Sequence, residues 1–133
     1  MKIDGRCQCG GIVYTAEVDP ETASICHCTD CQRFSGAPFR ASAPARIEDF
    51  RLVSGAPKIY VKTAESGRRR AQAFCGECGT PIYASAAENP TVLNLRLGAV
   101  KQRAEIAPRR QIWCSSALPW ALDVRALPSS PRD

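Results

Sequence analysis

A chain of 133 residues, of which 44% are hydrophobic, is long enough to bury one core and predicts a single domain. No stretch approaches the roughly 18 consecutive apolar residues that cross a bilayer, and the opening MKIDGRC lacks the pattern of a secretory signal. We therefore expect a cytoplasmic protein without membrane contact. The net charge of +5 could suggest a nucleic-acid partner, but seven thiolates and two divalent ions would lower it to about +2. Nucleic-acid binding is therefore not expected.

The first cysteine motif precedes a strand-like segment. Cys7 and Cys9 form a CxC pair, and residues two apart on an extended chain point to the same side, so both sulfurs can reach one ion. Apolar residues then alternate with polar ones, which predicts a strand with one buried face. The alternating residues are Ile12, Tyr14, Ala16 and Val18.

The stretch ICHCTDCQRFSG, residues 25–36, combines three cysteines with the only histidine of the chain. Cys26 and Cys28 repeat the CxC spacing, and Cys31 extends it by a CxxC spacing. Three sulfurs so close together in the sequence indicate a second thiolate site.

A short helix is predicted to begin inside this cluster. Thr29 and Gln32 have the spacing of a capping box, and Gly36 can take the left-handed conformation that ends a helix. With Thr29 as N-cap, Cys31 would lie in the first turn, where free amides and the positive end of the helix favour a thiolate.

Two further strands, within PKIYVKT and RRRAQAFC, are predicted before the third cysteine motif, FCGECGTP. Cys75 and Cys78 are separated by a turn in which Gly76 and Gly79 allow the backbone to fold around a metal. Leucines alternate again over residues 92–97, and frequent prolines and glycines exclude long helices. The predicted fold is therefore a mainly β, single compact domain of antiparallel sheets held by metal, with one short helix. We expect the domain to cover residues 1–126 and a flexible tail to cover 127–133.

The number of clustered cysteines exceeds one tetrahedral site and is one short of two. Soft thiolate ligands at these spacings favour zinc, with an iron–sulfur cluster as the alternative. Pairing the isolated CxC with the isolated CxxC gives a closed, structural site. This site would contain Cys7, Cys9, Cys75 and Cys78. The second ion would then be held by Cys26, Cys28 and Cys31 and would keep an open position for chemistry.

Two residues compete for that fourth position. Cys114, in the apolar stretch QIWCSSALPW, has no partner at ligand spacing, so we interpret it as a buried packing thiol with distant ligation as the alternative. His27 lies between two ligands and would point to the opposite face of an extended chain, which favours a structural role.

Disulfide bonds and dithiol redox chemistry are other uses of eight cysteines. Disulfides usually join cysteines that are far apart in sequence, whereas these lie two or three residues apart. A thioredoxin-like CxxC motif requires a βαβ context, but Cys75 and Cys78 lie in a glycine-rich turn. Both patterns favour metal binding.

Four segments together resemble the glutathione-dependent formaldehyde-activating enzyme family, which includes the centromere protein V group. They are CQCGGIVYTAEV, CHCTDCQRFSGAPF, FCGECGTPIY and IWCSSALPW, and the resemblance extends over about residues 5–122. It implies a mainly β fold with two zinc ions, the four-cysteine site being structural and the three-cysteine site catalytic. This division agrees with the one that the spacing favours.

The resemblance also implies a carbon–sulfur lyase that combines glutathione, or another thiol, with formaldehyde or a small aldehyde, or catalyses the reverse. A non-catalytic zinc module that binds a protein or nucleic acid is the alternative. Arg33, Phe39, Arg40, Trp113 and Trp120 are candidate pocket residues because they lie in or near the resembling motifs; core aromatics and surface cations are their ordinary explanation. The oligomeric state cannot be predicted.

Overall fold

The computed structural model describes residues 1–132 and contains two β-sheets and one short α-helix. The small sheet has the strand order β1-β2-β5, and the large sheet has the order β10-β3-β4-β9-β8-β7-β6. The mainly β prediction is confirmed. One detail differs, because β10 pairs with β3 in parallel, whereas all other neighbouring strands are antiparallel.

The strands are β1 (Lys2–Arg6), β2 (Val13–Glu17), β3 (Ser24–Cys26), β4 (Arg40–Arg46), β5 (Phe50–Ser54), β6 (Lys58–Thr63), β7 (Arg69–Phe74), β8 (Pro81–Ala86), β9 (Val92–Arg96) and β10 (Arg110–Ile112). The helix α1 is Thr29–Ser35. Single 3-10 turns occupy η1 (Pro20–Thr22), η2 (Ile47–Asp49), η3 (Leu97–Ala99), η4 (Arg103–Glu105), η5 (Cys114–Ser116) and η6 (Pro119–Leu122).

The small sheet packs one face into the core. Every second residue of β1 and β2 is buried, and the predicted alternation that starts at Ile12 is confirmed. Gly5, on β1, lies directly across from Tyr14, whose ring occupies the space that a side chain at Gly5 would need. A Cβ atom built there would lie 1.9 Å from Cζ of Tyr14, so only glycine fits.

The central strands of the large sheet supply most of the remaining core. Leu93 and Leu95 on β9 are buried, as their spacing predicts, and Ile82 on β8 joins them. On the opposite face of β9, Arg96 is also buried, with 5% of its surface exposed. The alternation of the leucines concerns the other face of the strand and does not predict this burial.

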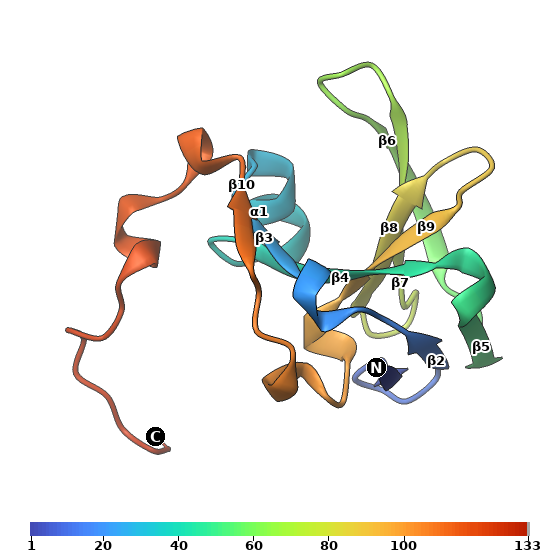
Figure 1. Cartoon of the computed structure of the whole chain (residues 1–133), viewed down its shortest axis with the longest axis horizontal. Coiled ribbons are helices and arrows are strands. Elements are labelled where there is room, and N and C mark those ends of the chain that lie inside the picture. The colour runs from blue at the N-terminus through green and yellow to red at the C-terminus, as the bar shows by residue number, and fades with distance from the viewer. Residues whose placement is uncertain (133) are drawn as a thin grey trace.

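The last part of the chain leaves the sheets after β10. Figure 1 shows residues 114–132 running away from the body of the molecule. Large apolar side chains on this segment, among them Trp120 and Leu122, are exposed. The expected tail, 127–133, is described as far as residue 132, and Asp133 lies outside the described residues. Within residues 1–132, no helix has the length and hydrophobicity needed to cross a membrane.

Candidate metal centres

Four cysteines from two distant parts of the chain come together in one group. The Sγ atoms of the group all lie within 4.8 Å of one another. Cys9 Sγ is 3.5 Å from Cys7 Sγ and 3.8 Å from Cys75 Sγ. Tetrahedral zinc with Zn–S bonds of about 2.3 Å separates its sulfurs by about 3.8 Å. The spacing therefore fits zinc. The group comprises Cys7, Cys9, Cys75 and Cys78.

Two tight turns bring these sulfurs together. In the first turn, the amide of Ile12 donates to Cys7 Sγ at 3.1 Å, and the amide of Cys7 donates to the carbonyl of Ile12 at 3.1 Å. In the second, the amide of Gly79 donates to the carbonyl of Cys75 at 2.8 Å while Gly79 has φ +79°. Left-handed backbone of this kind favours glycine, which explains its place in the CGECG segment.

Hydrogen bonds at the second turn favour the thiolate form. Oγ1 of Thr80 lies 3.2 Å from Cys78 Sγ. This contact, with the backbone amides of Cys9 and Thr80, lowers the pKa of Cys78 to about 5. Burial raises the pKa of Cys7, but the amide of Ile12 and the neighbouring cysteines outweigh it, so the pKa lies below its ordinary value. For Cys9, the amide of Gly11 lowers the pKa, but hydrogen bonds with the three other cysteines outweigh it and raise the pKa to about 11.

The second group is formed by Cys26, Cys28 and Cys31, whose Sγ atoms also lie within 4.8 Å of one another. Cys26 ends β3, and Cys31 is in the first turn of α1. Cys28 is the N-cap of α1, with its Sγ accepting from the amide of Cys31 at 3.3 Å. The predicted Thr29 cap is therefore wrong: the helix begins at Thr29, and the residue before it, Cys28, is the N-cap. The predicted stop at Gly36 is confirmed by its φ of 61°.

The pKa values of two cysteines in this group are shifted in opposite directions. A hydrogen bond with Cys31, opposed by burial and helped by the Cys28 amide, lowers the pKa of Cys26 to about 5. The same hydrogen bond, with burial, raises the pKa of Cys31. The lowered pKa of Cys26 favours the thiolate form, which is the form that binds a cation.

Neither candidate fourth residue joins this group in the described part of the chain. His27 is 1% exposed, and its Nε2 lies 2.8 Å from Oε1 of Gln111 on β10. Its ring packs edge-on against Phe39 with centroids 5.6 Å apart. Through these contacts, the histidine side chain packs between β3 and β10 and has a structural role.

Cys114 is exposed, so the interpretation as a buried packing thiol is wrong. It follows Trp113, which has an unusual positive φ of 58°. The apolar residues around Cys114 suggested a core segment. Instead, β10 is an exposed edge strand, and most of the described residues after it are exposed as well.

A cavity of about 420 Å³ has no cysteine among the described residues of its wall, and Gly79, which follows Cys78, lines it. Arg40 connects this cavity to the three-cysteine group, because its Nη2 donates to Cys31 Sγ at 2.9 Å and its side chain lines the cavity. Arg96 lines the same cavity from β9. Both guanidiniums donate to Oε1 of Gln72, Arg40 Nη1 at 3.2 Å and Arg96 Nη2 at 3.1 Å. The site therefore combines sulfurs with two linked cations.

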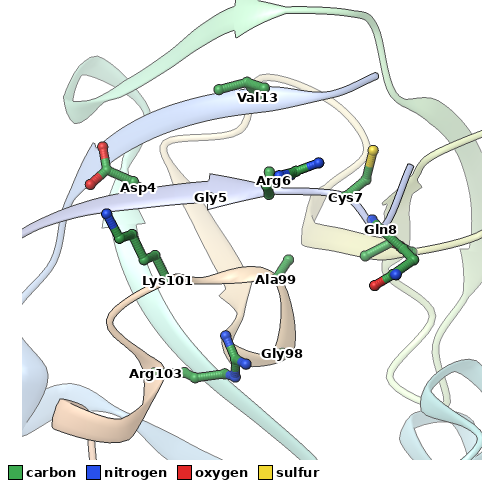
Figure 2. A pocket seen from close by; sticks show the side chains of 11 residues that line it. Asp4, Gly5, Arg6, Cys7, Gln8, Val13, Gly98, Ala99, Lys101 and Arg103 are labelled. Carbon is green, nitrogen blue, oxygen red and sulfur yellow. The ribbon is translucent and has the colours of Figure 1, made fainter. Parts of the chain in front are cut away.

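Another hollow, of about 530 Å³, lies along β1 on the four-cysteine side. Figure 2 shows Lys101 and Arg103 on one side of the strand and Val13 on the other, with Cys7 near its end. The carboxylate of Asp4 at this hollow accepts from Nε2 of Gln102 at 3.0 Å. No cysteine of the three-cysteine group lines it.

The model of one protein family, the glutathione-dependent formaldehyde-activating enzyme, matches residues 2–116. The chain belongs to this family. The resemblance noted in the cysteine motifs is confirmed, and at the level of the family the match supports glutathione-dependent formaldehyde activation. Comparison with curated proteins gives no match.

A solved structure shows the same fold. The crystal structure of a Rhodobacter sphaeroides protein, a structural genomics target, superimposes with a TM-score of 0.63 at 23% sequence identity. The alignment covers 84% of this chain and 99% of that chain. At this identity the similarity concerns the fold alone.

In this member of the formaldehyde-activating family, the candidate pocket residues divide into two sets. Arg33 and Arg40 line the cavity that Arg40 connects to the three cysteines, and Phe39 lines an adjoining cavity that shares Arg40 as a wall. Trp113 and Trp120 are exposed and line neither cavity. Sequence reasoning missed Gln72 and Arg96. The one available signal was a long cation in a strand otherwise formed by apolar and small polar residues.

Proposed function

We propose that this family member is a zinc-dependent carbon–sulfur lyase that acts on the adduct of glutathione, or of another thiol, with formaldehyde or a small aldehyde. The observation that supports it most is the difference between the two cysteine groups, one with four sulfurs and one with three. Four thiolates complete a tetrahedral zinc site, whereas three protein ligands are typical of catalytic zinc.

The roles of the cysteines follow from this difference. We infer that the four-cysteine group holds a structural zinc ion and that Cys26, Cys28 and Cys31 hold the catalytic one. When bound, the catalytic zinc would favour the thiolate form of a substrate thiol and hold it near the reacting carbon.

The reaction needs no oxidant or reductant. In the synthetic direction, the thiol sulfur forms a bond to the aldehyde carbon, the carbonyl π electrons move to oxygen, and that oxygen takes up the proton lost by sulfur. In the reverse direction, the C–S bond breaks and the C=O bond forms again. The chain has one histidine, which is buried and engaged with Gln111, so we assign the proton transfers to solvent water.

The residues around the three cysteines support a bound anion. The N–H of Arg40 and the amide of Cys31 both donate to sulfurs of the group, at 2.9 and 3.3 Å. Donors of this kind reduce the negative charge that the sulfurs place on an ion, which leaves that ion better able to attract one more thiolate.

Native mass spectrometry and NMR exchange spectroscopy together test this proposal. We expect two zinc ions per chain and faster interconversion of ¹³C-formaldehyde and S-(hydroxymethyl)glutathione in the presence of the protein. The protein carrying Cys28→Ser should keep one zinc ion and lose the acceleration. If the protein carries two zinc ions but does not accelerate adduct formation with glutathione or with simpler thiols, it is instead a non-catalytic zinc module.

A further inference from the structure

Arg96 is a buried cation without a carboxylate partner. It is 5% exposed, and its Nη1 donates to Oγ of Ser42 at 2.8 Å while its Nη2 donates to Gln72. Both acceptors are neutral. The ion pairs among residues 1–132 involve neither Arg96 nor Arg40. Since buried charges in proteins are normally paired, this arrangement indicates a missing anion.

Neighbouring cations strengthen that indication. Arg40 and Arg96 share one acceptor, Oε1 of Gln72, which holds their guanidiniums close together. Burial and then the charge of Arg40 lower the pKa of Arg96 to about 9, although the charges of Cys31 and Cys26 act in the opposite direction, and Arg96 stays charged at neutral pH. Arg70 belongs to the same positive region, since burial and the charge of Arg40 also lower its pKa. Like charges this close are unfavourable unless an anion joins them.

The cavity walls provide space for such an anion. Arg33, Arg40 and Arg96 line the first cavity of about 420 Å³, and none of its lining residues is acidic. Phe34 and Tyr60 form part of its apolar wall, with ring centroids 6.0 Å apart. A mainly apolar cavity with a few convergent cations is suited to a small organic anion.

The thiolates alone do not balance this charge. Three thiolates and one divalent ion carry a net charge of minus one, which the contact between Arg40 and Cys31 offsets. One positive charge of the Arg40–Arg96 pair then remains, and a substrate thiolate at the ion would balance it. Arg33, which lines the same cavity, and the neighbouring Arg70 would still leave positive charge for a second negative group.

We propose that Arg40 and Arg96 form a carboxylate-binding subsite that selects thiol substrates carrying a carboxylate near the sulfur. This inference rests on the proposed function. Arg40 contacts Cys31 Sγ at one Nη atom and, through Gln72, connects to Arg96, so the cationic surface leads directly from the sulfurs into the cavity. A thiol with a carboxylate a few bonds away can place its sulfur at the cysteines and its carboxylate at the arginines.

Thiols that differ only in the carboxylate test the subsite. Cobalt-substituted protein is titrated with 3-mercaptopropionate and with 3-mercaptopropionamide, and the change in the visible spectrum gives each Kd. We expect the Kd of 3-mercaptopropionate to be at least roughly tenfold lower than that of 3-mercaptopropionamide, which is the effect of a charge-assisted hydrogen bond to a buried guanidinium. Arg96→Met should bring the ratio of the two Kd values near one and should leave the Kd of the amide unchanged. The matched control is Arg51→Met, which removes an exposed cation on β5 and should keep the preference.

The outcomes separate this inference from the proposed function. If both thiols change the cobalt spectrum with equal Kd, or if Arg96→Met keeps the full preference, the carboxylate subsite is overturned while the thiol site stands. If neither thiol changes the spectrum of a protein that carries two metal ions, both proposals are overturned. Arg96→Met exchanges a buried charge for an apolar side chain of similar length, a change that proteins often tolerate. Circular dichroism and a content of two metal ions per chain establish that the variant is folded.

Discussion

The guanidinium of Arg40 donates a hydrogen bond to the sulfur of Cys31, with 2.9 Å between Nη2 and Sγ. The two residues lie on different elements, β4 and α1, so this contact joins the helix that contains Cys31 to the large sheet. The same arginine lines both cavities next to the site. It therefore connects the sulfur group, the large sheet and the two cavities.

Replacing Arg40 should weaken metal binding at the three-cysteine group. Contacts to the ligands of a metal typically change its affinity by about 10–100-fold, and we expect a loss in this range for Arg40→Met. Arg40→Lys, which keeps a donor, should lose less. Competition with a chromophoric chelator measures the affinity, and the cobalt–thiolate absorption bands should shift in the Met variant. Unchanged bands and affinity would show that the contact with Cys31 has no influence on the ion.

Two substitutions of Cys28 should separate its metal-binding role from its capping role. Serine removes the thiolate but can still accept the amide of Cys31 as an N-cap, whereas alanine removes both functions. We expect both variants to lose the second metal ion and the activity, and Cys28→Ala to be less stable than Cys28→Ser by about 1 kcal/mol. Urea denaturation of the two proteins measures the difference. Equal stability would mean that the cap at Cys28 contributes nothing.

Cys75→Ser should prevent the domain from folding. A structural zinc ion contributes roughly 10–16 kcal/mol, which is as large as the total stability of a typical domain, about 5–15 kcal/mol. Since Cys75 joins the end of β7 to the turn after β1, losing the ion would separate the two sheets. Circular dichroism and zinc content provide the measurement. A folded Cys75→Ser protein alongside an unfolded Cys28→Ser protein would reverse the proposed roles of the two groups.

Gly5 and Gly98 form a matched pair for testing the packing of the small sheet. Gly5→Ala places a methyl group onto the ring of Tyr14, and we expect a loss of about 3 kcal/mol or more. Gly98→Ala meets no atom within 4 Å and should change stability by less than about 1 kcal/mol. Thermal denaturation of both variants checks this. Similar melting temperatures would mean that Tyr14 moves aside at little cost.

Local features were accessible to sequence reasoning. The alternation at Ile12 and at Leu93 predicts strands because a pleated chain turns successive side chains to opposite faces. The stop of α1 at Gly36 follows from the backbone freedom of glycine. The division of seven cysteines into groups of four and three follows from their spacing, and the structure brings them together in those groups. These properties depend on a few neighbouring residues or on simple ligand counts.

Other features required the tertiary structure. Arg96 is buried only because Ser42 on β4 and Gln72 on β7 flank it, and these residues are separated from it by 54 and 24 positions. Cys114 is exposed because β10 pairs at an edge of the sheet rather than inside it. The N-cap of α1 is a cysteine because the sulfur group fixes the backbone before the helix begins. The sequence by itself determined which cysteines could act together and how they are grouped, because adjacent residues constrain one another directly. The surroundings of those cysteines were decided by the order in which the strands pair, which depends on contacts between distant residues.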